Sequence, residues 1–163
     1  MVQVRVAGLA VGAGAPVILL KSIFEEPGVG RILPIWIGSQ EATSIFVAVE
    51  GAETPRPLAH DLMKTLLQTV GAEVERVEVT KIEEGTFYAE ITLRTREGRR
   101  ILDSRPSDAI ALAARVDAPI WVADEVFDEA GVPDETGQPP SEEARVAEFK
   151  RFLDEVDPED FQG

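Results

Sequence analysis

RPSDAIALAARVDAPIWV, the stretch from Arg105 to Val122, decides the fold of this chain because it joins a charged turn to an apolar helix. Pro106 fits the first turn of a helix without losing a needed hydrogen bond, and Ser107 or Asp108 can accept from the free backbone N–H groups there. The next apolar residues recur at helical spacing, and residues 119–122 follow as a short buried strand. The stretch predicts a capped core helix, and its charged turn is a candidate site.

Composition limits the class of protein. The chain has 163 residues, enough for one domain with a sizeable core, and it has no cysteine. A disulfide framework, a thiolate metal site and a cysteine nucleophile are therefore excluded. The N-terminus alternates like a strand and lacks the apolar segment of a signal peptide, and no apolar run has the length of a membrane span. We expect a soluble, cytoplasmic protein.

The acidic charge is concentrated near the C-terminus. The net charge is −14, and residues 124–163 hold 14 acidic side chains against three basic ones, a net charge of −11. Residues 1–123 carry a net charge of only −3, so the compact part is close to neutral. A surface that neutralises many phosphates normally has clustered Lys and Arg. Any binding of RNA or DNA should therefore be weak and sensitive to salt.

Two halves of the chain share one order of elements. Apolar alternation predicts three strands in each half, followed by a helix. The predicted strands cover residues 2–9, 16–23, 31–37, 74–82, 86–95 and 99–104. The first helix closes near Gly51, and another helix runs from near Ala59 to Gly71 before the second half. This order predicts an α+β fold, in which a duplicated β-β-β-α unit forms a mixed, partly barrel-like sheet with helices packed on it. Aligned this way, Glu41 falls against Asp108.

The chain ends in an acidic amphipathic helix. After a predicted short helix over residues 124–130, the Pro and Gly content of residues 132–140 predicts a linker. Ser141 then caps a helix with acidic residues in its first turn and an apolar stripe that includes two phenylalanines. We expect this stripe to cover the domain or a partner subunit. The predicted parts are a domain over 1–131, a linker over 132–140, and an acidic helix and tail over 141–163.

PRPLAHD, over residues 55–61, is the other dense polar sequence and holds the only histidine, His60. A helix that begins near Ala59 places His60 and Asp61 in its first turn, where the helix dipole favours anions and Arg56 can reach a bound phosphate. The structural alternative is that Asp61 caps the helix, Arg56 pairs with it and His60 packs inside. The residue types allow both interpretations.

Two helix N-termini, each with an arginine before it and a carboxylate on it, suit a site for a phosphodiester. Arg56 and Arg105 would neutralise the phosphate, and His60 would act as acid or base. Three carboxylates could hold a divalent cation that activates water: those of Glu41, Asp61 and Asp108. Such oxygen ligands suit Mg²⁺ or Mn²⁺ better than zinc. No P-loop, dinucleotide fingerprint, zinc-protease motif or nucleophile elbow occurs.

Four sequences follow one another along the chain: LPIWIG with EA shortly after, PRPLAHDL, EGTFYAEI and SRPSDAIALAARVDAPIWV. In this order they resemble the bifunctional nuclease domain family, and the resemblance covers about residues 2–131. It implies hydrolysis of both RNA and DNA. For bacterial members it also implies a compact α+β homodimer with a duplicated strand and helix unit.

The resemblance also implies site residues at the matching motif positions. We expect four catalytic residues: His60, Asp61, Asp108 and Glu41. We expect four phosphate-binding residues: Arg56, Arg105, Ser107 and Tyr88. One position departs from the family, because Ala59 stands where threonine is expected before HD, so a hydroxyl cap or ligand is absent. The acidic tail after Gly131 lies outside the resemblance.

Two functions fit these observations. The first is a metal-assisted nuclease that hydrolyses phosphodiester bonds in RNA, DNA or both. The second is a non-enzymatic, dimeric binding or regulatory protein, in which the acidic tail mimics nucleic acid toward a basic partner or blocks the domain's own groove. The first requires the predicted side chains to lie together, and the second requires an exposed surface for a partner.

Overall fold

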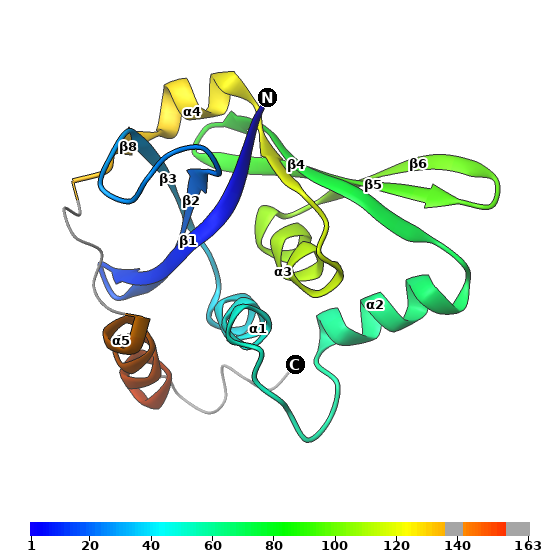
Figure 1. Cartoon of the computed structure of the whole chain (residues 1–163), viewed down its shortest axis with the longest axis horizontal. Helices are drawn as coiled ribbons and strands as arrows, with labels where there is room; N and C mark the ends of the chain where they lie inside the picture. The colour runs from blue at the N-terminus through cyan, green and yellow to red at the C-terminus, as the bar shows by residue number, and fades with distance from the viewer. Residues whose placement is uncertain (136–141, 156–163) are drawn as a thin grey trace.

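The computed structural model describes residues 1–135 and 142–155. In this part of the chain, eight strands form one open mixed sheet in the order β6-β5-β4-β7-β1-β2-β3-β8 (Figure 1). The strands are β1 (Val2–Gly12), β2 (Ala15–Ser22), β3 (Arg31–Trp36), β4 (Glu73–Glu83), β5 (Thr86–Thr95), β6 (Gly98–Ser104), β7 (Ile120–Val122) and β8 (Val132–Pro133). The helices are α1 (Ser39–Glu50), α2 (Ala59–Thr69), α3 (Pro106–Val116), α4 (Asp124–Ala130) and α5 (Glu142–Glu155). The predicted α+β class is confirmed.

The duplication predicted from the sequence is present in the topology. Strands β1 to β3 form one antiparallel meander and β4 to β6 another. Helix α1 follows the first meander and α3 follows the second. Strand β7 lies between the halves, antiparallel to β1 and parallel to β4. The two β-β-β-α units therefore lie on either side of β7, as Figure 1 shows.

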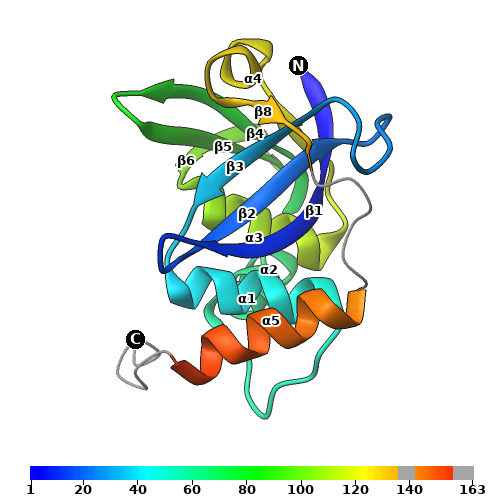
Figure 2. The ribbon, with the colours of Figure 1, turned by 90° about the vertical axis from the view of Figure 1, so that its left-hand side faces the viewer.

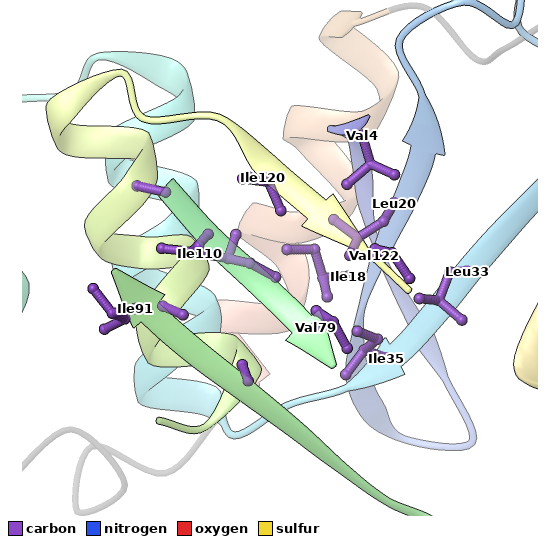
Figure 3. Close-up of a cluster of buried hydrophobic side chains, with 14 of the residues drawn as sticks. Val4, Ile18, Leu20, Leu33, Ile35, Val79, Ile91, Ile110, Ile120 and Val122 are labelled. Carbon is purple, nitrogen blue, oxygen red and sulfur yellow. The ribbon is translucent and has the colours of Figure 1, made fainter. Parts of the chain in front are cut away.

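The sheet curves strongly around one core without closing into a barrel. Helix α4 contacts both β3 and β4, although three strands separate them in the sheet. Side chains from these distant strands, Ile35 and Val79, approach each other in the core (Figure 3). Ile110 of α3 is fully buried in the same cluster. Because α3 contacts β4, β5, α1 and α2, it is the central helix against which the candidate site is built.

Helix α3 begins differently from the prediction. Arg105 occupies the N-cap position, and no side chain forms a capping hydrogen bond there. The predicted cap by Ser107 or Asp108 is therefore wrong. Ser107 is buried, and the Asp108 carboxylate is bound to other side chains. Pro106, as the first helical residue, leaves one fewer N–H group to satisfy.

The segment predicted as a linker begins with part of the sheet. Val132 and Pro133 form β8, which pairs with β3. The buried Asp134 accepts a hydrogen bond from Lys21 Nζ at 2.8 Å and one from the Gly28 backbone N–H at 2.9 Å. These contacts fasten residues 132–134 to the domain. The rest of the expected linker, residues 136–140, lies outside the described residues.

Helix α5 packs along β1 and beside α1 (Figure 2). The Phe149 ring lies 4.7 Å from the Phe46 ring between centroids, and Arg145 Nη1 donates to the Ala7 carbonyl at 2.6 Å. The pairing of β1 with β2 shifts register at Ala7, and the carbonyl there binds the arginine. The expected amphipathic helix thus covers the domain, while the predicted cap, Ser141, lies outside the described residues. In the part of the chain that the structure describes, no helix combines the length and apolar character needed to cross a membrane.

Candidate active site

A chain of hydrogen bonds joins α1, α2 and α3. Ser44 Oγ and His60 Nδ1 lie 2.6 Å apart, and His60 Nε2 lies 2.8 Å from Asp108 Oδ1. Arg105 Nε donates to Asp108 Oδ2 at 2.9 Å, and its Nη2 donates to Glu41 Oε1 at 2.7 Å. We call these five residues the polar chain. Its order is Ser44, His60, Asp108, Arg105, Glu41.

The duplication explains why the two carboxylates of the polar chain face one arginine. Glu41 is the third residue of α1, and Asp108 is the third residue of α3. These equivalent positions lie in the first turns of helices that pack together, where the helix dipole stabilises an anion. Arg105 precedes α3 and binds both carboxylates. The two residues that align in the repeat, Glu41 and Asp108, are therefore linked in the structure through Arg105.

The polar chain runs from the interior to the surface. Ser44 and His60 are 4% and 5% exposed, whereas the Arg105 side chain is 66% exposed. The Asp108 and Glu41 side chains, at 24% and 15%, lie between these extremes. A molecule from solvent can therefore contact the Arg105 end of the polar chain but not the histidine ring.

The charges at this end are fixed near neutral pH. Burial raises the pKa of Asp108, but hydrogen bonds from His60 and Arg105 outweigh it and hold the pKa below its usual value. Hydrogen bonds to Asp108 and Glu41 raise the pKa of Arg105. The Arg105 end therefore presents a permanent guanidinium beside an ionised carboxylate.

Asp61 forms a separate branch beside the polar chain. Its Oδ2 accepts from the Leu58 backbone N–H at 2.8 Å, and its Oδ1 accepts from Arg115 Nε at 2.7 Å. Arg115 Nη2 also donates to the Ser44 carbonyl at 3.1 Å. Burial raises the pKa of Asp61, but the hydrogen bonds from Arg115 and Leu58 outweigh burial and hold the pKa below its usual value. Asp61 thus binds the start of α2, as the structural alternative predicted, but its partner is Arg115 and not Arg56.

Three other predicted residues lie outside the polar chain. Arg56 is exposed in the loop before α2 and lines a shallow surface hollow with Asp61. Tyr88 lies on β5, with Lys81 Nζ 4.6 Å from its ring centroid. Ser107 is only 6% exposed in the first turn of α3. The structure therefore brings together Glu41, His60, Arg105 and Asp108 among the eight predicted residues.

Two residues of these networks were missed from the sequence. Ser44 lies three positions after Glu41, a spacing that places both on one helix face. Arg115 lies in the last turn of α3, within the stretch RPSDAIALAARVDAPIWV, but nothing local indicated its partner. The helical spacing from Glu41 was a usable signal for Ser44, whereas Arg115 became visible only once the packing of α2 on α3 was known.

The predicted divalent cation needs several oxygen or nitrogen ligands close together. Among residues 1–135 and 142–155, no three His, Asp or Glu side chains are grouped so that they could hold a metal ion. Glu41 and Asp108 are bound to Arg105, and Asp61 is bound to Arg115. The three carboxylates do not form one ligand set, so these side chains alone do not make a cation site.

A curved sheet of two β-β-β-α units, with charged first turns joined by one arginine, defines the class as a duplicated α+β domain protein. Residues 18–135 match the family model described as the bifunctional nuclease domain. The chain belongs to the bifunctional nuclease domain family, as its motifs predicted. The match extends past Gly131 to residue 135 and therefore includes β8 and Asp134.

Similar proteins occur in bacteria and plants. An uncharacterized protein of Mycobacterium tuberculosis is 41% identical over 170 residues, which cover 99% of both chains. Bifunctional nuclease 1 of Arabidopsis thaliana is 32% identical over 66% of this chain and 33% of its own length. Bifunctional nuclease 2 of Oryza sativa subsp. japonica is 31% identical over 68% of this chain and 34% of its own length. The similarity to the plant proteins thus covers about a third of each of them.

Proposed function

We propose that this chain is a nuclease that hydrolyses phosphodiester bonds in RNA, DNA or both. The observation that carries the proposal is the exposed guanidinium of Arg105, held between the Asp108 and Glu41 carboxylates. A planar guanidinium matches the geometry of a phosphate, and an adjacent carboxylate can accept a proton from attacking water. Membership of the bifunctional nuclease domain family supports the same reaction class.

The proposed reaction uses the surface end of the polar chain. A substrate phosphate takes over guanidinium N–H groups that Arg105 now gives to Glu41, and the freed Glu41 carboxylate accepts a proton from water. The water oxygen forms a bond to phosphorus, the P–O bond to the leaving oxygen breaks, and that oxygen takes a proton from solvent. Arg105 stabilises the charge that develops on the phosphoryl oxygens.

Two sequence predictions stay predictions beside this mechanism. The divalent cation, Mg²⁺ or Mn²⁺, enters no step above, because the described side chains alone do not hold one. Mg²⁺ is commonly bound through one or two carboxylates together with substrate phosphates, so a substrate-dependent requirement is testable. The cytoplasmic location is likewise a prediction from the N-terminal sequence.

A cleavage assay tests the proposal. The purified full-length chain is incubated with end-labelled single-stranded RNA and DNA at low salt, with and without a chelator. His60→Ala and Asp108→Asn variants are assayed beside it. We expect both variants to lose cleavage, because His60 and Asp108 orient Arg105. Cleavage that survives both substitutions unchanged would belong to a contaminant. Full activity in the presence of chelator would contradict the predicted need for a divalent cation.

The second candidate function, a dimeric binding protein, is favoured by a different surface. Three apolar side chains at four-residue spacing along α2 and its C-cap, Leu62, Leu66 and Val70, are more than half exposed, and we call them the α2 patch. Exposed apolar patches on single chains commonly mark protein interfaces. We propose that a second copy of this chain covers the patch, which gives the homodimer predicted from the sequence. Dimerisation is compatible with both functions, and the cleavage assay separates them.

A further inference from the structure

The histidine of the polar chain has no free ring nitrogen. Its Nδ1 lies 2.6 Å from Ser44 Oγ and its Nε2 lies 2.8 Å from Asp108 Oδ1. The residue is 5% exposed, between α1 and α3. A group that transfers a proton to substrate needs a ring nitrogen within hydrogen-bond reach of the reacting atom. His60 does not meet this requirement, although the sequence predicts it as a catalytic acid or base.

The hydrogen-bonding partners fix where the ring proton lies. A neutral imidazole has one N–H donor and one acceptor nitrogen. The Asp108 carboxylate has only acceptors, and it already accepts from Arg105, so His60 must donate through Nε2. Nδ1 is then the acceptor, and the Ser44 hydroxyl must donate to it. The neutral ring is therefore held as the Nε2–H tautomer.

We propose that Ser44 and His60 are positioning residues, which act on substrate only through Asp108. The Asp108 carboxylate fixes the tautomer of His60, and the Ser44 hydroxyl holds the orientation of the ring by donating to Nδ1. The His60 Nε2–H group in turn fixes the rotation of the Asp108 carboxylate. The second oxygen of Asp108 then holds Arg105 Nε at 2.9 Å and aims the guanidinium at Glu41. The functional part of this assignment rests on the proposed nuclease function. The tautomer itself does not.

Ser44→Ala is a clean probe because it preserves the other contact of Ser44. The Ser44 backbone carbonyl accepts from Arg115, which also binds Asp61, and alanine keeps that carbonyl. The link between α1, α2 and α3 through Arg115 therefore persists when the hydroxyl is removed. Thr43→Ala is the matched control on the same helix, because among residues 1–135 and 142–155 the Thr43 hydroxyl bonds only to the Ser39 carbonyl, at 2.9 Å.

Asp108→Asn is a second, independent probe. Arg105 needs an acceptor, so it binds the amide oxygen of the asparagine. The amide NH₂ group then faces His60 Nε2, which must become an acceptor. We expect the ring to change to the Nδ1–H tautomer, with Ser44 accepting from it. This variant keeps the size of the side chain, removes its negative charge and replaces one acceptor with a donor.

The test is ¹⁵N NMR of the histidine ring in the full chain, at a pH above the usual imidazole pKa. His60 is the only histidine, so the ring signals need no residue assignment, and the couplings to the ring protons Hδ2 and Hε1 distinguish Nε2 from Nδ1. We expect a protonated Nε2 and an unprotonated Nδ1 in the wild type and Thr43→Ala. In Ser44→Ala we expect the same tautomer, with the Nδ1 signal shifted because this nitrogen loses its hydrogen-bond donor. In Asp108→Asn we expect the reverse tautomer. An Nδ1–H wild type, or a Ser44→Ala spectrum identical to the wild type, would overturn the proposal.

A second arm separates this inference from the proposed function. A non-hydrolysable dinucleotide analogue is added to the same ¹⁵N sample. We expect the Arg105 Nε–H signal, assigned by its loss in Arg105→Gln, to shift while the His60 ring keeps its tautomer. If the tautomer result holds but the Arg105 signal does not respond, the nuclease function fails and the ring assignment stands. If the dinucleotide changes the His60 tautomer, the ring takes part directly and the positioning role is wrong.

Discussion

At the scale of single residues, Asp108 couples the buried histidine to the exposed arginine. Its pKa is lowered below the ordinary value of 3.8 by hydrogen bonds from His60 and Arg105, which outweigh the effect of burial. An ionised Asp108 therefore stabilises the fold at neutral pH. This stabilisation is lost as the pH falls through the lowered, folded-state pKa.

The first prediction follows from the lowered pKa of Asp108. Asp108→Asn should lower the free energy of unfolding by about 1 to 3 kcal/mol near pH 6, because a charged hydrogen-bonding partner is lost. The difference in unfolding free energy between wild type and variant should shrink below about pH 4. Asp108 takes up a proton there in the unfolded chain before it does so in the folded chain, which weakens the advantage of the ionised carboxylate. Urea unfolding at several pH values measures it. A difference that is constant from pH 7 to pH 3 would show that the ionised carboxylate contributes nothing.

Gly38 provides a second test at this scale. A Cβ atom on Gly38 would collide with Glu41 Oε2, although its φ of −77° suits alanine. Gly38→Ala should therefore displace the Glu41 carboxylate from Arg105 and reduce cleavage, at a cost in stability of no more than about 1 kcal/mol. Cleavage rates and urea midpoints are compared with those of Ser39→Ala, the next residue. Wild-type cleavage in Gly38→Ala would contradict the proposed role of Glu41.

Some residues of the candidate site could be predicted from the sequence, but their long-range partners could not. Glu41 and Asp108 could be predicted because each stands in the first turn of a helix with a recognisable start. For Ser44, the sequence offered only its helical spacing from Glu41, because the partner of a serine within a helix is not known until the facing residue is known. The partner of Asp61 was predicted as the nearby Arg56, whereas packing brings Arg115 from another helix. Long-range contacts of this kind depend on the helix arrangement and not on local spacing.

At the scale of elements, local pattern predicted the strands and helices closely, because alternation and helical spacing are properties of short segments. The order of strands could not be predicted, since β7 enters the sheet between β1 and β4 from a distant part of the sequence. Strand β8 was missed because two residues, one of them proline, have no measurable period. Its presence extends the domain beyond the predicted boundary at residue 131.

The third prediction tests whether this extension stabilises the domain. Asp134→Ala removes the buried carboxylate that pairs with Lys21, which is 1% exposed. Lys21 keeps its contacts with the Val29 carbonyl and, at 3.9 Å, with the Glu25 carboxylate, so we expect a cost of about 3 kcal/mol. Asp128→Ala is the control, because Asp128 pairs with Arg31 at the surface and should cost less than about 1 kcal/mol. Equal urea midpoints for the two variants would mean that the buried Asp134 carboxylate adds nothing to the stability of the fold.

At the scale of the whole molecule, charge and apolar surface lie in different places. The strong acidity lies in the C-terminal quarter of the sequence. The exposed apolar side chains of the α2 patch lie in the family domain. Helix α2 contacts α3 but leaves its other face open, as Figure 1 shows. A second copy of the chain would bury these side chains and so gain hydrophobic stabilisation.

The fourth prediction concerns this surface. Leu66→Lys should shift the chain from dimer to monomer in sedimentation velocity, because a charged side chain would be buried at the centre of the α2 patch. Val49→Lys on α1 is the control, since Val49 is also half exposed but lies outside the patch. A wild-type chain that is monomeric at all concentrations would remove the homodimer from the proposal.

The central claim is that the Arg105 end of the polar chain binds and cleaves a phosphodiester. It is tested most directly by comparing the rates at which Arg105→Gln and Arg94→Gln cleave labelled single-stranded RNA. Arg94 is matched to Arg105, because its side chain is 67% exposed and pairs with a carboxylate, that of Glu73. Loss of a transition-state charge contact typically costs about 100-fold or more in rate. We predict a loss of that size in Arg105→Gln and a wild-type rate in Arg94→Gln, and equal rates in the two variants would contradict the claim.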